Sequence, residues 1–317
     1  MLKAKNRIVQ QLQESRAGDM RPHRVAGAIL PPENWEMSEI RELLGSLSLD
    51  NAPSAELANY LNEDFERFLI TWNLLRNHSG TALEIGANPY FTTILLREFS
   101  NLTMTLTNSF DSNSKGKSSQ AASYSYPKSK GSVSFSGDFE YENINVEIDL
   151  IPYENESFDV VIFCEVIEHL ISDPVSALNE MGRVLKPGGT LIVSTPNVAR
   201  LENVSKMIVG ENIYDPYSGY GPYGRHNREF TRHEIVNLLQ FCGFSVNNHF
   251  TTDVHSDGAL SMVPAKTLKQ LVSHRKDDLG QYLFCIATKS EIGTQGRPNE
   301  IYRSLPSDQL TSWSQKQ

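Results

Sequence analysis

The sequence predicts an α/β protein built on a doubly wound, mostly parallel sheet. Three short apolar runs, at residues 81–86, 158–164 and 190–195, stop at glycine, a charged residue or proline, as buried strands do. Segments with helical spacing of apolar residues separate these runs. Because strands that alternate with helices are joined by right-handed crossovers, we expect the three runs to lie parallel in one sheet.

Length and composition agree with this fold class. The 317 residues are enough for one large α/β domain with extensions, or for two small domains, and 39% of them are hydrophobic. No stretch approaches the apolar length that crosses a bilayer, and the N-terminus lacks the apolar segment of a secretory signal. Three scattered cysteines suit a reducing compartment. We expect a cytoplasmic protein without a membrane span.

The charge balance bears on the partners of the protein. The formal net charge of −9 disfavours binding of nucleic acid through broad neutralisation of phosphates. Small or neutral substrates fit this charge better. The sequence contains no internal repeat, and nothing in it indicates the oligomeric state.

The chain divides into a main domain with additions on either side. Residues 39–77 suggest helices within an N-terminal extension. One apolar stripe recurs there at three- and four-residue spacing, at Leu61, Phe65, Phe68, Leu69, Trp72 and Leu75. Residues 111–137 are rich in Ser, Lys, Gly and Tyr and predict a long loop. The expected division is a helical extension at 1–78, a main domain at 79–290 that holds the serine-rich loop 111–137, a tyrosine-rich lid at 199–225 and an insertion at 256–279, and a polar tail at 291–317.

The end of the first predicted strand has the features of a ligand-binding turn. Residues 83–86 read Leu-Glu-Ile-Gly and are followed by a predicted helix at 92–99. Ligands of open α/β sheets bind beyond the carboxyl ends of the strands, where the topology changes direction. Gly86 lacks a Cβ and would let a ligand approach the backbone, while the helix N-terminus favours a carboxylate.

Three motifs taken together resemble those of class I S-adenosylmethionine-dependent methyltransferases of the type 11/23 kind. They are the turn at 83–86, the run Phe-Asp-Val-Val at 158–161, and Arg-Val-Leu-Lys-Pro-Gly-Gly at 183–189. The resemblance covers roughly residues 81–287 and implies a Rossmann-like sheet of seven strands with S-adenosylmethionine as the methyl donor. The positions it implies for the cofactor are Glu84, Gly86, Ala87, Asn88, Asn108, Glu147 and Cys164.

The chain departs from the family pattern at two of these positions. Residues 87–90, Ala-Asn-Pro-Tyr, stand where the family has further glycines. Asn108 stands where the family has an acid that binds the ribose hydroxyls; an amide can still accept and donate, and Asp111 is the second candidate. For the adenine amino group we expect Glu147, with Asn145 in reserve.

An acid and histidine cluster follows the central strand at residues 164–170, Cys-Glu-Val-Ile-Glu-His-Leu. Side chains three and four apart on a helical turn face one another, so Glu165, Glu168 and His169 can converge. The Glu-x-x-Glu-His pattern is similar to that of ubiquinone-pathway O-methyltransferases and of small-RNA 3′-end 2′-O-methyltransferases, which associate it with a divalent cation. The second of these families implies His226 as a further ligand, since it precedes Glu-Phe-Thr-Arg here.

Three roles for this cluster are left open by the sequence. Glu165, Glu168, His169 and His226 could bind Mg²⁺, Mn²⁺ or Zn²⁺, which would orient and activate an acceptor hydroxyl. His169 could instead act as a general base without a metal, or the cluster could be structural. The expected catalytic residues are His169, Glu165 and His226.

The resemblance implies O-methylation of a small molecule or a glycan precursor. Two alternatives are metal-assisted 2′-O-methylation of an RNA 3′ terminus and a fold that binds the cofactor without catalysis.

Overall fold

The computed structural model describes residues 29–110, 115–131, 133–256, 258–275, 277–290 and 293–312. The second candidate for the ribose, Asp111, lies outside the described residues.

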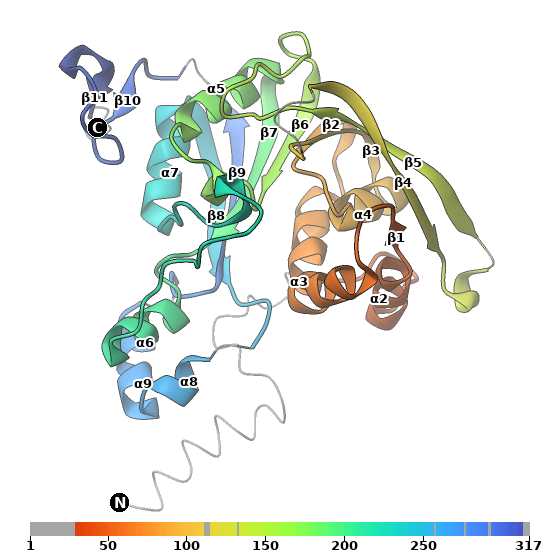
Figure 1. Ribbon diagram of the computed structural model, residues 1–317, viewed down its shortest axis with the longest axis horizontal. Helices are drawn as coiled ribbons and strands as arrows, with labels where there is room; N and C mark the ends of the chain where they lie inside the picture. The colour runs from red at the N-terminus through yellow and green to blue at the C-terminus, as the bar shows by residue number, and fades with distance from the viewer. Residues whose placement is uncertain are drawn as a thin grey trace, which may run out of the picture.

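A single large sheet organises the molecule (Figure 1). Within the described residues it has nine strands in the order β1-β4-β5-β3-β2-β6-β7-β9-β8. The strands are β1 (Ser48–Leu49), β2 (Ser79–Ile85), β3 (Asn101–Asn108), β4 (Gly116–Ser125), β5 (Ser134–Asn143), β6 (Phe158–Cys164), β7 (Leu185–Pro196), β8 (Phe244–Thr252) and β9 (Tyr282–Lys289).

The centre of the sheet confirms the predicted doubly wound α/β class. Strands β5, β3, β2, β6 and β7 are parallel to their neighbours in this group, and β9 enters antiparallel between β7 and β8. The expected number of seven strands is wrong, because β1 and β4 extend the sheet beyond β5. The chain reverses its winding between β2 and β6, so the carboxyl ends of these two strands mark the expected ligand site.

The serine-rich segment 111–137, expected to be a loop, contributes instead to a β-hairpin. Strands β4 and β5 pair antiparallel from Gly116 opposite Asn143 to Ser125 opposite Ser134. Ala122, Tyr124 and Phe139 are buried, while the serines alternate with them and stay exposed. Only this one face of the hairpin carries apolar residues, so their period of two is hidden in a composition typical of loops.

Helices cover both faces of the sheet (Figure 1). Helices α2 (Met37–Gly45), α3 (Ser54–Leu75) and α4 (Phe91–Phe99) share one apolar core with the sheet. Helices α5 (Pro174–Val184) and α7 (Arg232–Phe241) share the other core. Alternate residues of β6 enter the two cores, Val160 and Ile162 on one side and Val161 and Phe163 on the other. The described part of the N-terminal extension, from residue 29 onward, is therefore packed against the sheet.

The expected lid and insertion pack together, away from the sheet (Figure 1). Helix α6 (Leu201–Val209) lies in the lid segment, and α8 (Ala259–Met262) and α9 (Ala265–His274) lie in the insertion. Leu201, Val263 and Leu268 belong to one small apolar cluster that joins the two segments. None of the described helices combines the length and apolar character needed to span a membrane.

The tail expected at 291–317 folds back on the domain in its described part. It forms the short parallel pair β10 (Arg297–Pro298) and β11 (Leu310–Thr311). Arg297 donates hydrogen bonds to both carboxylate oxygens of Asp173, at 2.7 and 2.6 Å. Asp173 is the N-cap of α5, so the tail is tied to the start of that helix.

Candidate functional site

A cavity of about 240 Å³ lies at the carboxyl ends of β2, β3 and β6. This is the position expected for a ligand at the point where the winding of the sheet reverses. Of the residues expected in the site, Gly86, Asn88, Asn108, Asn145, Glu165 and His169 line it, and the lid contributes Tyr223.

Gly86 is required by the geometry of the turn. Its φ of +71° lies in the left-handed region, and a Cβ built on it would stand 2.7 Å from Cγ2 of Val166. The amide N–H of Gly86 donates to the carbonyl of Thr107 at 2.9 Å, which joins the turn to β3. A glycine at this position therefore brings the chain close to the cavity without a clash.

Four of the positions implied for the cofactor, Glu84, Ala87, Cys164 and Glu147, do not line this cavity. Glu84 is buried below α4 and accepts a hydrogen bond of 2.6 Å from the hydroxyl of Thr93. Its burial raises the pKa of the carboxyl from 4.5 to about 7. Ala87 is buried in the core that includes α4, and the partly buried Cys164 packs against the same core. Glu84 is therefore buried and bonded to Thr93 in this structure, and its expected contact with an ammonium group stays a prediction.

Asn108 lines the cavity, but its side chain also holds the turn after β2. Oδ1 accepts a hydrogen bond of 2.8 Å from the backbone N–H of Asn88. Nδ2 donates to the hydroxyl of Tyr90 at 3.1 Å. These two bonds leave one N–H and one lone pair of the amide for a ligand.

Glu147, expected to recognise adenine, uses its carboxylate to hold a turn of the protein. Backbone N–H groups of Ile171, Ser172 and Asp173 donate to it, the first at 3.1 Å and the last at 2.6 Å. The hydroxyl of Tyr223 donates to it as well, at 2.9 Å. Burial alone would raise the pKa of Glu147, but these donors outweigh it and lower the pKa. Asn145, the reserve candidate, lines the cavity instead.

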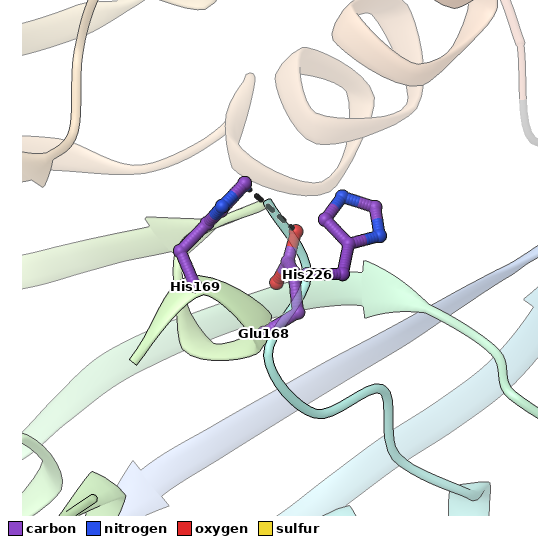
Figure 2. Close-up of side chains that lie close together, drawn as sticks. All are labelled: Glu168, His169 and His226. Carbon is purple, nitrogen blue, oxygen red and sulfur yellow. Dashed lines mark ion pairs between the residues drawn. The ribbon is translucent and has the colours of Figure 1, made fainter. Parts of the chain in front are cut away.

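The acid and histidine cluster brings together Glu168, His169 and His226 (Figure 2), and His169 among them lines the cavity. Glu168 and His169 lie on η2 (Ile167–His169), and His226 follows η3 (Pro222–Gly224) from the lid. One possible ligand atom of each of the three lies within 4.8 Å of the others. The Nε2 of His169 stands 3.9 Å from Oε1 of Glu168. Glu165 is not part of this group and accepts a 2.6 Å hydrogen bond from Ser194.

Hydrogen bonds fix the orientation of all three side chains. The Nδ1 of His169 lies 3.0 Å from the carbonyl oxygen of Arg225, and Nδ1 of His226 lies 3.0 Å from Oε1 of Glu229. Glu168 accepts from the hydroxyl of Thr195 through Oε2, at 2.8 Å. Its Oε1 is buried and has no hydrogen-bond partner within the described part of the chain.

Burial and neighbouring charges shift the pKa values in the cluster. Desolvation raises the pKa of Glu165 and of Glu168, and repulsion between the two carboxylates adds to the rise for Glu165. Burial and the nearby His226 lower the pKa of His169. Burial also opposes the charge on His226, but its bond to Glu229 and the field of Glu168 raise its pKa.

Helix α3 brings a charged side chain, Arg67, close to Glu165, and no sequence motif marks this residue as part of the site. Arg67 is buried and donates from Nε to Asp64 at 3.2 Å and from Nη2 to the hydroxyl of Tyr60. Its positive charge lowers the pKa of Glu165 and so opposes the effect of burial. The apolar stripe of α3 predicts the helix but not its polar contacts. The spacing of Tyr60, Asp64 and Arg67 by four and three residues is the signal that places these side chains on one helix face.

Comparison with protein families finds a methyltransferase domain. Residues 106–193 match the family described as "Methyltransferase domain". A probable S-adenosylmethionine-dependent methyltransferase from Mycolicibacterium smegmatis is 34% identical over 98 residues, which are 31% of this chain and 33% of that protein. The mitochondrial ubiquinone biosynthesis O-methyltransferase of Homo sapiens is 33% identical over 100 residues, 31% of this chain and 26% of that protein. The similarity therefore spans a third or less of the length of these two relatives.

Solved structures of the same kind also align with the chain. A SAM-dependent methyltransferase from Archaeoglobus fulgidus covers 73% of this chain with 99% of its own, at a TM-score of 0.45 and 16% identity. Another from Aquifex aeolicus covers 81% of this chain with 100% of its own, at a TM-score of 0.40 and 15% identity.

Proposed function

We propose that this chain, which carries a class I S-adenosylmethionine-dependent methyltransferase domain, transfers a methyl group to a hydroxyl oxygen of a small molecule or glycan precursor. The observation that carries the proposal is the continuity of the cavity with the acid and histidine cluster. Gly86 and Asn108 line the same 240 Å³ cavity as Glu165 and His169. A methyl donor held at the turn after β2 would thus lie beside groups that can deprotonate an acceptor.

The lid side of the cavity suits a ring-containing acceptor. Tyr223 lines the cavity. A second lid tyrosine, Tyr217, lies under the guanidinium of Arg225, which is 5.0 Å from the centroid of the Tyr217 ring. Aromatic faces pack well against sugars and other rings. Similarity to ubiquinone biosynthesis O-methyltransferases also favours an oxygen acceptor.

In the proposed reaction the acceptor oxygen attacks the sulfonium methyl carbon. The new O–CH₃ bond forms as the S–CH₃ bond breaks, and S-adenosylhomocysteine leaves with the electron pair of that bond on sulfur. The hydroxyl proton must pass to a base. With no cation bound, Nε2 of His169 is the nitrogen that can take this proton, because Nδ1 is directed at the carbonyl of Arg225. With the cation proposed below, Nε2 is a ligand, and the carboxylate of Glu165, which lines the same cavity, takes the proton.

The donor set of the cluster fits a divalent cation. Both histidines are oriented through Nδ1 by an oxygen of the protein, which is the usual outer-shell arrangement for an imidazole that binds metal through Nε2. Glu168 adds a buried carboxylate oxygen without a described partner. We propose that Glu168, His169 and His226 hold the ion. When bound, such an ion lowers the pKa of an acceptor hydroxyl and orients it.

Calorimetry with S-adenosylhomocysteine tests the cofactor assignment. We expect saturable binding to the full chain, and an absence of binding at millimolar ligand would overturn the proposal. Labelled methyl transfer into an extract, followed by identification of the labelled product, then tests for an oxygen acceptor. A product methylated on nitrogen or carbon would contradict O-methylation.

Titration of the protein with Mn²⁺, followed by electron paramagnetic resonance, tests the metal assignment independently of activity. We expect one bound ion per chain, lost in Glu168→Gln and in His226→Ala but retained in His233→Ala. His233 is a matched control because its ring lies on α7 and interacts with Asn237 outside the cluster. Equal binding by all four proteins would rule out the proposed ligands.

A further inference from the structure

The side chain of Gln120, on β4, joins the β4–β5 hairpin to the turn that follows β2 by hydrogen bonds. Oε1 of Gln120 accepts two hydrogen bonds of 3.0 Å, one from Nδ2 of Asn88 and one from the hydroxyl of Tyr90. Its Nε2 donates to the carbonyl of Asp50 at 2.7 Å. The amide oxygen of Gln120 is thus bonded to the turn, and its amide nitrogen is bonded to the N-terminal extension.

The turn itself has an unusual backbone. Tyr90 is the N-cap of α4 and has a φ of +67°. This left-handed region is sterically unfavourable for a side chain as large as tyrosine, whereas the glycines of a glycine-rich turn adopt it freely. The conformation therefore requires contacts that over-determine it.

The hairpin supplies those contacts. The ring of Tyr90 stacks on Phe139 with centroids 4.3 Å apart and planes 18° apart. Phe139 is the cross-strand partner of Gln120, so one pair of hairpin residues holds both the ring and the hydroxyl of Tyr90. Tyr90 in turn accepts from Asn108, and Asn108 accepts from the backbone of Asn88. Asn88 and Asn108 both line the cavity.

We propose that Gln120 is a positioning residue for the methyl donor, and that the hairpin replaces the glycines absent from the turn after β2. Gln120 holds Asn88 and Tyr90, and through them Asn108, in the arrangement that a bound donor meets. Gln120 is not itself among the residues that line the cavity. The inference rests on the proposed function, since it assumes that the donor occupies this cavity.

Substitution of Gln120 in the full chain tests the inference, with S-adenosylhomocysteine as the calorimetric probe. Gln120→Leu removes the acceptor for two hydrogen bonds and is expected to raise the Kd about tenfold. Gln120→Glu loses the Nε2 donor to Asp50 but keeps an acceptor oxygen for Asn88 and Tyr90, so it is expected to stay within about threefold of the native Kd. Ser123→Leu is the matched control, because Ser123 is exposed on the same strand.

A second variant covers the case in which Gln120→Leu does not fold. Tyr90→Phe keeps the ring that stacks on Phe139 and removes only the hydroxyl, and it is expected to raise the Kd about fivefold. The double variant Gln120→Leu/Tyr90→Phe should raise the Kd by less than the product of the two single effects, because both disrupt one bond.

The outcomes separate this inference from the proposed function. A native chain that does not bind S-adenosylhomocysteine overturns the proposed function and the inference with it. Native binding that is unchanged in Gln120→Leu and in Tyr90→Phe overturns the inference alone. Equal weakening in Gln120→Leu, Gln120→Glu and Ser123→Leu also overturns it, since that result indicates a general effect on the hairpin.

Discussion

At the scale of single residues, Glu84 and Gly86 belong to one motif but have different surroundings, the first in the core and the second at the cavity. A glycine is required at position 86 because its φ is positive and because a Cβ there would clash with Val166. Glu84, two positions earlier, points away into the core and is partnered by Thr93. Alternation along the strand does not explain this difference, because residues two positions apart share a face. Gly86 instead lies beyond the end of β2, where its left-handed backbone turns the chain, whereas Glu84 is still within the strand and below α4.

Gly86→Ala is expected to weaken S-adenosylhomocysteine binding at least about tenfold, because the added methyl group must displace Val166 at the cavity wall. Calorimetry measures the effect. Gly188→Ala is the control, since Gly188 has a similar φ of +74° but open space where its Cβ would be. If both variants bind as the native chain does, the close approach at Gly86 has no role in the site.

Glu84→Gln is expected to make the protein more stable at pH 8 than the native chain. Burial raises the pKa of Glu84 from 4.5 to about 7, so the folded state favours the neutral acid and ionisation destabilises it as pH rises through this interval. The difference in unfolding free energy should approach about 3 kcal/mol above pH 7 and vanish below pH 4.5. Urea unfolding across this range measures it, and a pH-independent difference would contradict the assignment.

At the scale of secondary structure elements, α3 is held to the sheet by a buried ion pair as well as by its apolar stripe. Arg67 and Asp64 form a bridge of 3.2 Å with side chains that are 5% and 8% exposed. The hydroxyl of Tyr282, at the start of β9, donates to Asp64 at 2.8 Å. The pair therefore links the extension to the strand that borders β7.

Arg67→Met is expected to destabilise the fold by about 3 to 5 kcal/mol, because it leaves the carboxylate of Asp64 buried without its counter-charge. Denaturant unfolding measures the loss. Arg275→Met is the control, since Arg275 and Asp278 have the same spacing but are 37% and 30% exposed, and its effect should stay below about 1 kcal/mol. Similar losses in the two variants would show that burial does not set the strength of the Arg67 pair.

At the scale of the whole molecule, the C-terminal segment connects the far end of the chain to the region of the site. Asp173 receives Arg297 and the hydroxyl of Tyr302, and it caps the helix that follows η2. The turn between η2 and α5 is also held by Glu147. Two distant segments of the chain thus fix the residues just after His169.

Arg297→Leu is expected to reduce the unfolding free energy by about 1 to 2 kcal/mol near pH 7. Burial opposes the charge of Asp173, but Arg297 and the other donors outweigh it and hold its pKa below 3.8. A depressed folded pKa stabilises the protein above pH 3.8 and loses that effect as pH falls further, so the difference between native and variant should shrink below pH 4.

Thermal unfolding of Arg297→Leu at pH 7 and at pH 3.5 provides the measurement. Arg228→Leu is the control, because its bridge to Glu234 is a more exposed pair in which Arg228 is 47% exposed. An effect of Arg297→Leu that does not depend on pH would mean that Asp173 is not its partner in solution.

The sequence by itself determined the class of the fold. It also predicted the place of the cavity and three of the four residues expected in the metal cluster, whereas Glu165 lies outside that group. The apolar runs at 81–86, 158–164 and 190–195 correspond to most of β2, all of β6 and the second half of β7, because hydrophobic periodicity is a local property. Gly86, Asn108 and His169 line the cavity because strand order places their strand ends together. The convergence of His226 with Glu168 also follows the expected pattern.

Only the tertiary structure decided which side chains are free to meet a ligand. Glu147 and Glu84 carry carboxylates suited to the cofactor, but backbone donors occupy the first and burial below α4 encloses the second. The serine-rich segment pairs as a hairpin because Tyr124 and Phe139 find a core that a local pattern does not show. Hydrogen-bond partners and burial depend on contacts between distant segments, so residue type alone does not specify them.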